Sequence, residues 1–219
     1  MGNGTYRDSS GRSLEDYPRP SVAVDTAVLA PDPEIGLVVL QVRRGQGRGW
    51  ALPGTFIHPR ETLADAVTRS LDQKANIRGL CPRQLHVFDA PDRDDRGWVL
   101  SVAHIAVVPL ERLSTRLTEN TRLMPVDAPG RLIYDHPDII ALAVDDVRAR
   151  YAAAPDPDGL LADEFTLREL RLVHEAVKGK AVQRDTFRRA METQLEPTGT
   201  WVVAGRGRPA ELFRVRRLT

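Results

Sequence analysis

Three polar residues near the middle of the chain, Ser70, Gln73 and Lys74, have a spacing at which side chains act together. On a helix, residues three and four positions apart share one face. Three carboxylates on such a face would form a hard oxygen site for Mg²⁺ or Mn²⁺. This face instead offers a hydroxyl, an amide and an ammonium that would repel a metal ion. The sequence therefore predicts no metal site, no cofactor and no catalytic residue here.

A second group of residues has the chemistry of nucleic-acid binding. From residue 179 onward the chain carries 9 Lys and Arg residues against 4 Asp and Glu, and arginine pairs with guanine or clamps phosphate. Thr186, near a predicted helix start, offers backbone N–H groups to phosphate. The stretch 206–209, "RGRP", resembles a hook for the minor groove, where narrow grooves attract arginine; a plain turn with solvated arginines is the alternative. The predicted DNA-binding residues are Lys180, Arg184, Thr186, Arg188, Arg189, Arg206 and Arg208.

The first two thirds of the chain alternate between strand and helix patterns. Two β-branched runs, "SVAVDTAVLA" and "IGLVVLQVRR", flank the turn signal "PDPE" and predict a hairpin. The stretch 61–76 has helical spacing. Strands are expected near 83–89 and 98–108, followed by a helix from Pro137 to about Ala153.

The pattern changes after "AAAPDPDG", residues 152–159, which has the composition of a linker. Thr166 and Glu169 form a capping-box signature at the start of one helix, which ends at "GK". A second helix follows in "RDTFRRAMETQL", with Phe187, Ala190 and Met191 facing inward. Two strands around a Gly-rich turn complete the order of elements that is typical of a winged helix-turn-helix.

Composition places the chain among globular proteins. Apolar residues make up 42% and charged residues 28%. No apolar run approaches the roughly 18 residues of a membrane span, and the first residues lack the apolar core of a signal peptide. Cys81 is the single cysteine, so no internal disulfide can form and the expected compartment is the reducing cytoplasm.

The stretch "WALPGTFIHPRETLADAVTRSLDQKAN" and the later "DAPDRDDRGWVLSVAHIAVVP" resemble a Nudix domain over roughly residues 20–150. Glu61 and Arg69 match two positions of the Nudix motif, whereas Ser70, Gln73 and Lys74 stand where that family has metal-binding glutamates. The resemblance implies a cleft for a nucleoside diphosphate, because arginine binds phosphate bidentately. Core filling by the aromatic residues and solvated loop charge for the arginines are the alternatives. The predicted ligand-binding residues are Arg43, Trp50, Phe56, Glu61, Arg93, Arg96 and His136.

An acid-poor Nudix domain followed by a winged helix resembles the NrtR family of Nudix-related transcriptional regulators. The resemblance implies an α+β fold, in which a Nudix-like α/β/α sandwich with a mixed sheet precedes a winged helix-turn-helix. The expected parts are a disordered tail over 1–18, the Nudix-like domain over 19–151, a linker over 152–160 and the DNA-binding domain over 161–219.

The same resemblance implies a homodimeric repressor of genes for NAD biosynthesis or salvage. Its partners would be a pseudo-palindromic double-stranded DNA operator and ADP-ribose or a related nucleotide, with no membrane. Two alternatives stay open: a Nudix hydrolase of ADP-ribose with secondary DNA binding, and a constitutive DNA binder whose Nudix part only dimerises.

Overall fold

The larger part of the protein is built on one mixed sheet. The structure is a computed structural model that describes residues 6–45, 49–203 and 209–216. The strand order is β3-β2-β1-β6-β5, with β4 paired to β1 and β7 paired to β2. The central strands β1 and β6 are parallel, and the other pairs are antiparallel. The strands are β1 (Ser21–Asp32), β2 (Gly36–Arg43), β3 (Trp50–Ala51), β4 (Gly54–Phe56), β5 (Arg83–Phe88), β6 (Val99–Val107) and β7 (Thr121–Pro125).

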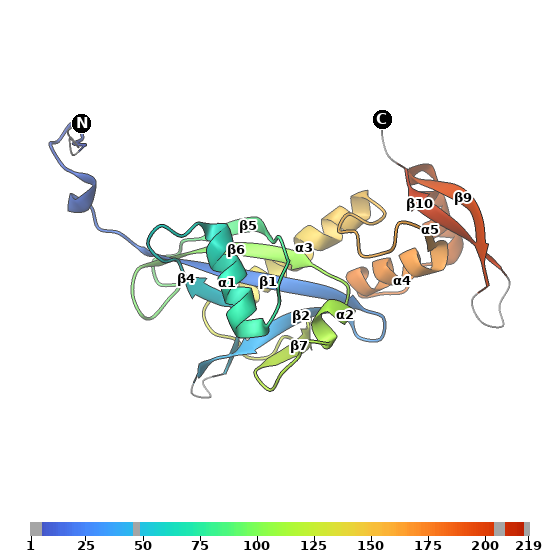
Figure 1. Cartoon of the computed structure of the whole chain (residues 1–219), viewed down its shortest axis with the longest axis horizontal. Helices are drawn as coiled ribbons and strands as arrows, with labels where there is room; N and C mark the ends of the chain where they lie inside the picture. The colour runs from blue at the N-terminus through green and yellow to red at the C-terminus, as the bar shows by residue number, and fades with distance from the viewer. Residues whose placement is uncertain (1–5, 46–48, 204–208, 217–219) are drawn as a thin grey trace.

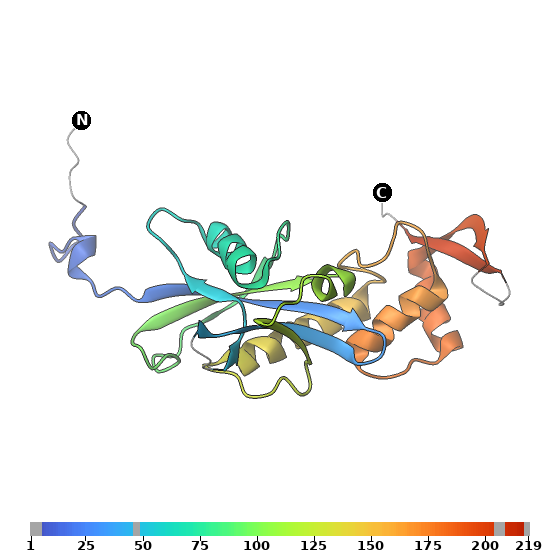
Figure 2. The ribbon, with the colours of Figure 1, turned by 60° about the horizontal axis from the view of Figure 1, so that its bottom comes forward.

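Helices cover both faces of this sheet, so it is the middle layer of a sandwich (Figure 1; Figure 2). Helix α1 (Leu63–Ala75) buries Ala66, Val67 and Leu71 against one face, together with the short α2 (Glu111–Ser114). Helix α3 (His136–Ala153) buries its apolar residues against the other face. Burial of both faces explains why β1 and β2 are almost continuously apolar.

The C-terminal part has the order of a winged helix. The short β8 (Phe165–Thr166) leads into α4 (Leu167–Lys178) and α5 (Arg184–Met191), and β9 (Leu195–Val202) and β10 (Ala210–Val215) form the hairpin. The sheet order is β8-β10-β9. Thr166 and Glu169 form the expected capping box, and Gly179 ends α4 in the left-handed conformation. The small core contains Phe165, Leu170, Phe187, Met191 and Leu195.

Helix α4 belongs to both parts of the molecule. Val177 and the partly buried Val173 pack into the core of the large sheet, whereas Leu170 packs into the winged-helix core. The ring of His174 contacts both cores, because it packs edge-on against Tyr151 of α3 and against Phe187 of α5. The two parts are therefore packed against each other through one helix (Figure 1).

The predicted fold class is confirmed, with some local differences. The stretch expected as a loop before α1 contains β3 and β4, because short pairings with β2 and β1 leave little sequence signal. The expected tail contains a 3-10 turn (Leu14–Asp16) capped by Ser13. Ala190 is exposed rather than inward-facing, because the buried side of α5 is formed by Phe187 and Met191. The domain boundaries stay a prediction.

The segment that was expected to be a linker is held by specific hydrogen bonds. Asp156 accepts the backbone N–H groups of Leu160 and Leu161 and the hydroxyl of Tyr151. Arg150 pairs with Asp158 at 2.7 Å.

None of the helices in the described parts of the chain is long and apolar enough to cross a membrane.

Candidate functional site

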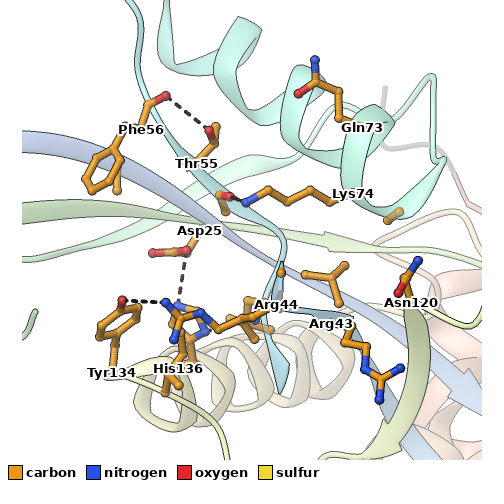
Figure 3. A pocket seen from close by; sticks show the side chains of 18 of the residues that line it. Asp25, Arg43, Arg44, Thr55, Phe56, Gln73, Lys74, Asn120, Tyr134 and His136 are labelled. Atoms are coloured by element: carbon orange, nitrogen blue, oxygen red, sulfur yellow. Dashed lines mark hydrogen bonds and ion pairs between the residues drawn. The ribbon is translucent and has the colours of Figure 1, made fainter. Parts of the chain in front are cut away.

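A cationic cavity of about 1020 Å³ is bordered by the large sheet and by elements from both of its faces. Strands β1, β2 and β4 supply its floor, and the end of α1 and the start of α3 supply walls (Figure 3). The loop 93–96 completes the lining. Cations outnumber carboxylates in the lining, so the cavity favours an anionic ligand. The ionisable lining residues are Asp25, Arg43, Arg44, Lys74, Arg93, Asp94, Arg96, Tyr134 and His136.

Asp25 is the buried carboxylate of the cavity floor. Ser101 donates a hydrogen bond to Asp25 at 2.6 Å, and Nε2 of His136 lies 3.3 Å from it. Burial acts to raise the pKa of Asp25, but the hydrogen bonds from His136 and Ser101 and the nearby charge of Arg93 outweigh burial, so the pKa lies below its ordinary value. Asp25 is therefore a fixed negative charge. A Cβ on Gly54 would lie 1.9 Å from Oδ1 of Asp25, so only glycine fits there.

His136 is held in one tautomer by its two neighbours. The backbone N–H of Leu52 donates to Nδ1 at 3.0 Å, so Nδ1 carries no proton. The proton therefore lies on Nε2 and is donated to Asp25. This arrangement assigns His136 the role of orienting Asp25, although the ring also lines the cavity.

Two of the predicted phosphate-binding arginines are already paired with carboxylates. Arg93 forms a bidentate pair with Asp135 at 2.5 and 2.7 Å. Arg96 pairs with Asp94 at 2.6 and 2.8 Å, and its guanidinium lies about 5 Å from the rings of Phe56 (5.0 Å) and Tyr134 (5.1 Å). Arg44 reaches the hydroxyl of Tyr134 at 3.2 Å (Figure 3).

The structure brings most of the predicted ligand-binding residues together. Arg43, Phe56, Arg93, Arg96 and His136 all line the cavity, whereas Trp50 and Glu61 lie outside its lining in the described part of the chain. Trp50 lies against the guanidinium of Arg122, 4.2 Å from the ring centre. Glu61 is bound by Arg69 at 2.7 and 2.8 Å.

The salt bridge between Glu61 and Arg69 gives these two residues a structural role. The hydrogen bond from Arg69 lowers the pKa of Glu61 to about 2. Arg69 also donates to the carbonyl oxygen of Phe56 at 2.9 Å. Together the contacts fasten the loop before α1 to the helix. Glu61 and Arg69, the two residues that match the Nudix motif, therefore hold the loop against α1 in this structure.

The prediction missed Asp25 and Tyr134. Asp25 carried a signal, because it is the only charged residue in the apolar run "SVAVDTAVLA". A charge within a buried strand requires partners. Those partners, Ser101 and His136, are far away in sequence, and the pairing of β1 with β6 was needed to identify them. Tyr134 carried no comparable signal.

The helix face with the missing acids does not fit a metal ion. Ser70 is buried, and its hydroxyl has no hydrogen-bond partner among the described residues. The amide of Gln73 points away from Asp25 (Figure 3). Lys74 donates a hydrogen bond to the carbonyl oxygen of Gly54. Within the described residues, no group of three His, Cys, Asp or Glu side chains is placed to hold a metal.

The predicted DNA-binding residues of α5 lie on its solvent side. Arg184, Arg188 and Arg189 are exposed, and none forms a salt bridge with another residue that the structure describes. Lys180 is also exposed, in the turn before α5. Both the backbone N–H and the hydroxyl of Thr186 bind Oε1 of Gln183, so Gln183 occupies the N–H group that was expected to meet phosphate. Arg206 and Arg208 lie outside the described residues.

The comparisons with known proteins agree with this architecture. A family model of the NrtR DNA-binding winged helix domain matches residues 159–215. The "ADPR responsive transcriptional repressor NtrR" of Acinetobacter baylyi is 30% identical over 212 residues, which cover 91% of this chain and 83% of that protein. The chain belongs to the NrtR family.

The chain is similar to a solved NrtR structure and to the sequence of an enzyme. The crystal structure of Shewanella oneidensis NrtR complexed with a 27mer DNA superposes with a TM-score of 0.73 and 29% identity, and it covers 89% of this chain and 93% of that chain. An ADP-ribose pyrophosphatase of Methanocaldococcus jannaschii is 30% identical over 125 residues, which cover 57% of this chain and 73% of the enzyme. Relatives of this NrtR-family chain thus include both a repressor and a hydrolase.

Proposed function

We propose that this protein is an ADP-ribose-responsive transcriptional repressor of genes for NAD biosynthesis or salvage, acting in the cytoplasm. The winged helix binds double-stranded DNA, and the cationic cavity binds ADP-ribose or a related nucleotide. Two copies pair through their Nudix domains, so that two α5 helices face the half-sites of a pseudo-palindromic operator.

The exposed arginines of α5 are the observation that carries this proposal. The solvent side of α5 carries Arg184, Arg188 and Arg189, and its opposite side buries Phe187 and Met191 in the winged-helix core. Exposed guanidinium groups that form no salt bridge with the described residues have the chemistry that binds phosphates and guanine edges. Membership of the NrtR family supports the same assignment.

The cavity supports a nucleotide effector. Its volume of about 1020 Å³ accommodates a molecule the size of a dinucleotide, and its cations match a diphosphate. Ligand binding shifts the equilibrium between two poses of the winged helices only if the two poses bind the ligand with different affinity. A coupling free energy of about 1–3 kcal/mol is enough for a useful switch.

The hydrolase alternative is disfavoured by the chemistry of α1. Hydrolysis of a pyrophosphate requires cations that neutralise charge and activate water, but Ser70, Gln73 and Lys74 supply no carboxylate. Mg²⁺-dependent release of AMP from ADP-ribose by the purified protein would establish the enzyme; no release at high metal concentration is expected.

Operator binding tests the proposal directly. DNA recovered with the protein from its own genome should identify the operator and the target genes. Arg188→Ala should weaken binding to that operator in a gel-shift titration and lower the salt dependence by about one counterion. Arg78→Ala is the matched control, because Arg78 is an exposed arginine on the large domain that pairs with Asp72. Unchanged affinity of Arg188→Ala would refute the assignment of α5.

ADP-ribose added to the wild-type complex separates the sensor from a constitutive DNA binder. A sensor changes its operator affinity when ADP-ribose binds, whereas a constitutive binder does not. Calorimetry with ADP-ribose, NAD and related nucleotides then identifies the effector.

A further inference from the structure

The positively charged side chain of Lys74 is part of the cavity lining. It extends from the C-terminal end of α1 beneath the helix and donates a hydrogen bond to the carbonyl oxygen of Gly54 (Figure 3). Gly54 is packed so closely against Asp25 that no side chain fits between them. The ammonium is therefore held near enough to Asp25 for the charge of that carboxylate to act on it.

The ammonium of Lys74 also has hydrogen-bonding capacity to spare. An ammonium has three N–H donors, and the described contacts use one of them, on a neutral carbonyl group. By contrast, the guanidinium groups of Arg93 and Arg96 are already committed to Asp135 and Asp94. Lys74 thus keeps free donors at the cavity, whereas the guanidinium groups of Arg93 and Arg96 are held in ion pairs.

A divalent ion at this place would meet the wrong groups. The α1 face supplies the buried hydroxyl of Ser70, the amide of Gln73 and a positive charge. Hard cations such as Mg²⁺ require several oxygen ligands, of which carboxylates are the strongest. Both carboxylates of the lining are already engaged, Asp25 by Ser101 and His136 and Asp94 by Arg96.

We propose that the ammonium of Lys74 replaces the divalent cation of a Nudix site, binds the diphosphate of the nucleotide ligand directly, and makes ligand binding independent of metal. This inference rests on the proposed effector function. It also explains how the cavity binds without hydrolysing, because an ammonium neutralises phosphate charge but does not activate a water molecule.

The surroundings of Lys74 are consistent with this role. Burial lowers the pKa of Lys74 from its ordinary value, the carboxylate of Asp25 opposes that shift, and Arg69, Arg44 and Arg96 lower the pKa further. A diphosphate placed on the ammonium would supply the negative charge that these groups lack. Ligand and lysine therefore stabilise each other's charged forms.

Calorimetric titration with ADP-ribose, once with EDTA and once with excess MnCl₂, tests the inference. Wild-type protein should bind equally well in both buffers. Lys74→Met should bind more weakly by about 10-fold or more, the effect expected for loss of a charge-assisted hydrogen bond. Arg78→Met removes one exposed cation just beyond the C-terminal end of the same helix and should bind like wild type. Thermal melts of each variant confirm folding.

A second variant reverses the charge of Lys74. Gln73→Glu combined with Lys74→Glu supplies two carboxylates, and should bind ADP-ribose poorly in EDTA and better with Mn²⁺. Electron spin resonance should detect Mn²⁺ bound by this double variant but not by the wild type. Wild-type affinity that collapses in EDTA, or Lys74→Met affinity equal to wild type, would overturn the role of Lys74.

The two arms distinguish the inference from the proposed function. If the wild type binds no ADP-ribose in either buffer, the proposed effector is wrong. The Mn²⁺ measurement then decides on Lys74 alone, because tight Mn²⁺ binding by the wild type contradicts the replacement, and its appearance only in the double variant supports it.

Discussion

Acidification should destabilise the joint between the two parts of the molecule through His174. This histidine is fully buried between Tyr151 and Phe187, with ring centres 5.2 and 4.9 Å away. Its Nε2 donates to the carbonyl oxygen of Pro155 at 2.6 Å, and its Nδ1 has no partner among the described residues. Protonation would therefore add a buried N–H without an acceptor. Burial accordingly lowers the pKa of His174 below its ordinary value.

The size of the effect follows from linkage. The native pKa lies below the unfolded one, so the stabilising contribution is complete above the unfolded pKa of about 6.5 and is lost as the pH falls from there toward the native pKa. If the native ring stays neutral, lowering the pH from about 7.5 to about 5.5 costs about 1.4 kcal/mol of unfolding free energy. Burial also lowers the pKa of His104, which should add a second loss of the same sign.

Denaturant unfolding at both pH values measures this loss. His174→Phe keeps a ring between Tyr151 and Phe187 but does not titrate, so its pH-dependent loss should be smaller than the wild-type loss, by at most about 1.4 kcal/mol. His104→Phe should remove its own share independently, because distant sites add. Equal pH dependence of wild type and His174→Phe would show that His174 accepts its proton without cost, and would refute this reasoning.

Four further substitutions should have separable effects. Phe187→Ala should lower the unfolding free energy by about 3 kcal/mol or more through the cavity it leaves, whereas Arg188→Ala should stay within about 0.5 kcal/mol in the same denaturation experiment. Thr166→Ala should cost about 1 kcal/mol because it removes the capping box of α4, which a thermal melt would detect. Gly54→Ala should abolish calorimetric binding of ADP-ribose, because its Cβ would collide with Asp25; operator binding without ligand should survive, and unchanged ligand affinity would contradict the tight packing.

The features that the sequence predicted are those with local causes. The capping box of Thr166 and Glu169 and the left-handed stop at Gly179 are set by neighbouring residues, so the start and end of α4 were readable. The missing acids at Ser70, Gln73 and Lys74 were readable for the same reason, because helical spacing alone places them on one face.

The features that were missed depend on contacts between distant residues. The pairing of β1 with β6 brings Ser101 to Asp25 in the floor of the cavity. The start of α3 brings His136 to the same carboxylate. Trp50 illustrates the same limit, because an aromatic residue in a loop stacks on an arginine or on a ligand with equal chemical ease. Only the fold places the guanidinium of Arg122 on its ring.

Helix α4 constrains how the molecule can be taken apart and how it can move. Its Val173 and Val177 fill the core of the sheet while Leu170 fills the core under the hairpin. A fragment that begins after Asp156 would expose the apolar side chains of Val173 and Val177 to solvent. The winged-helix domain should therefore fold poorly when it is expressed by itself. Because α4 is packed into both cores, ligand binding in the cavity is expected to change the DNA-binding surface by reorienting α4, which would move the arginines of α5 with it.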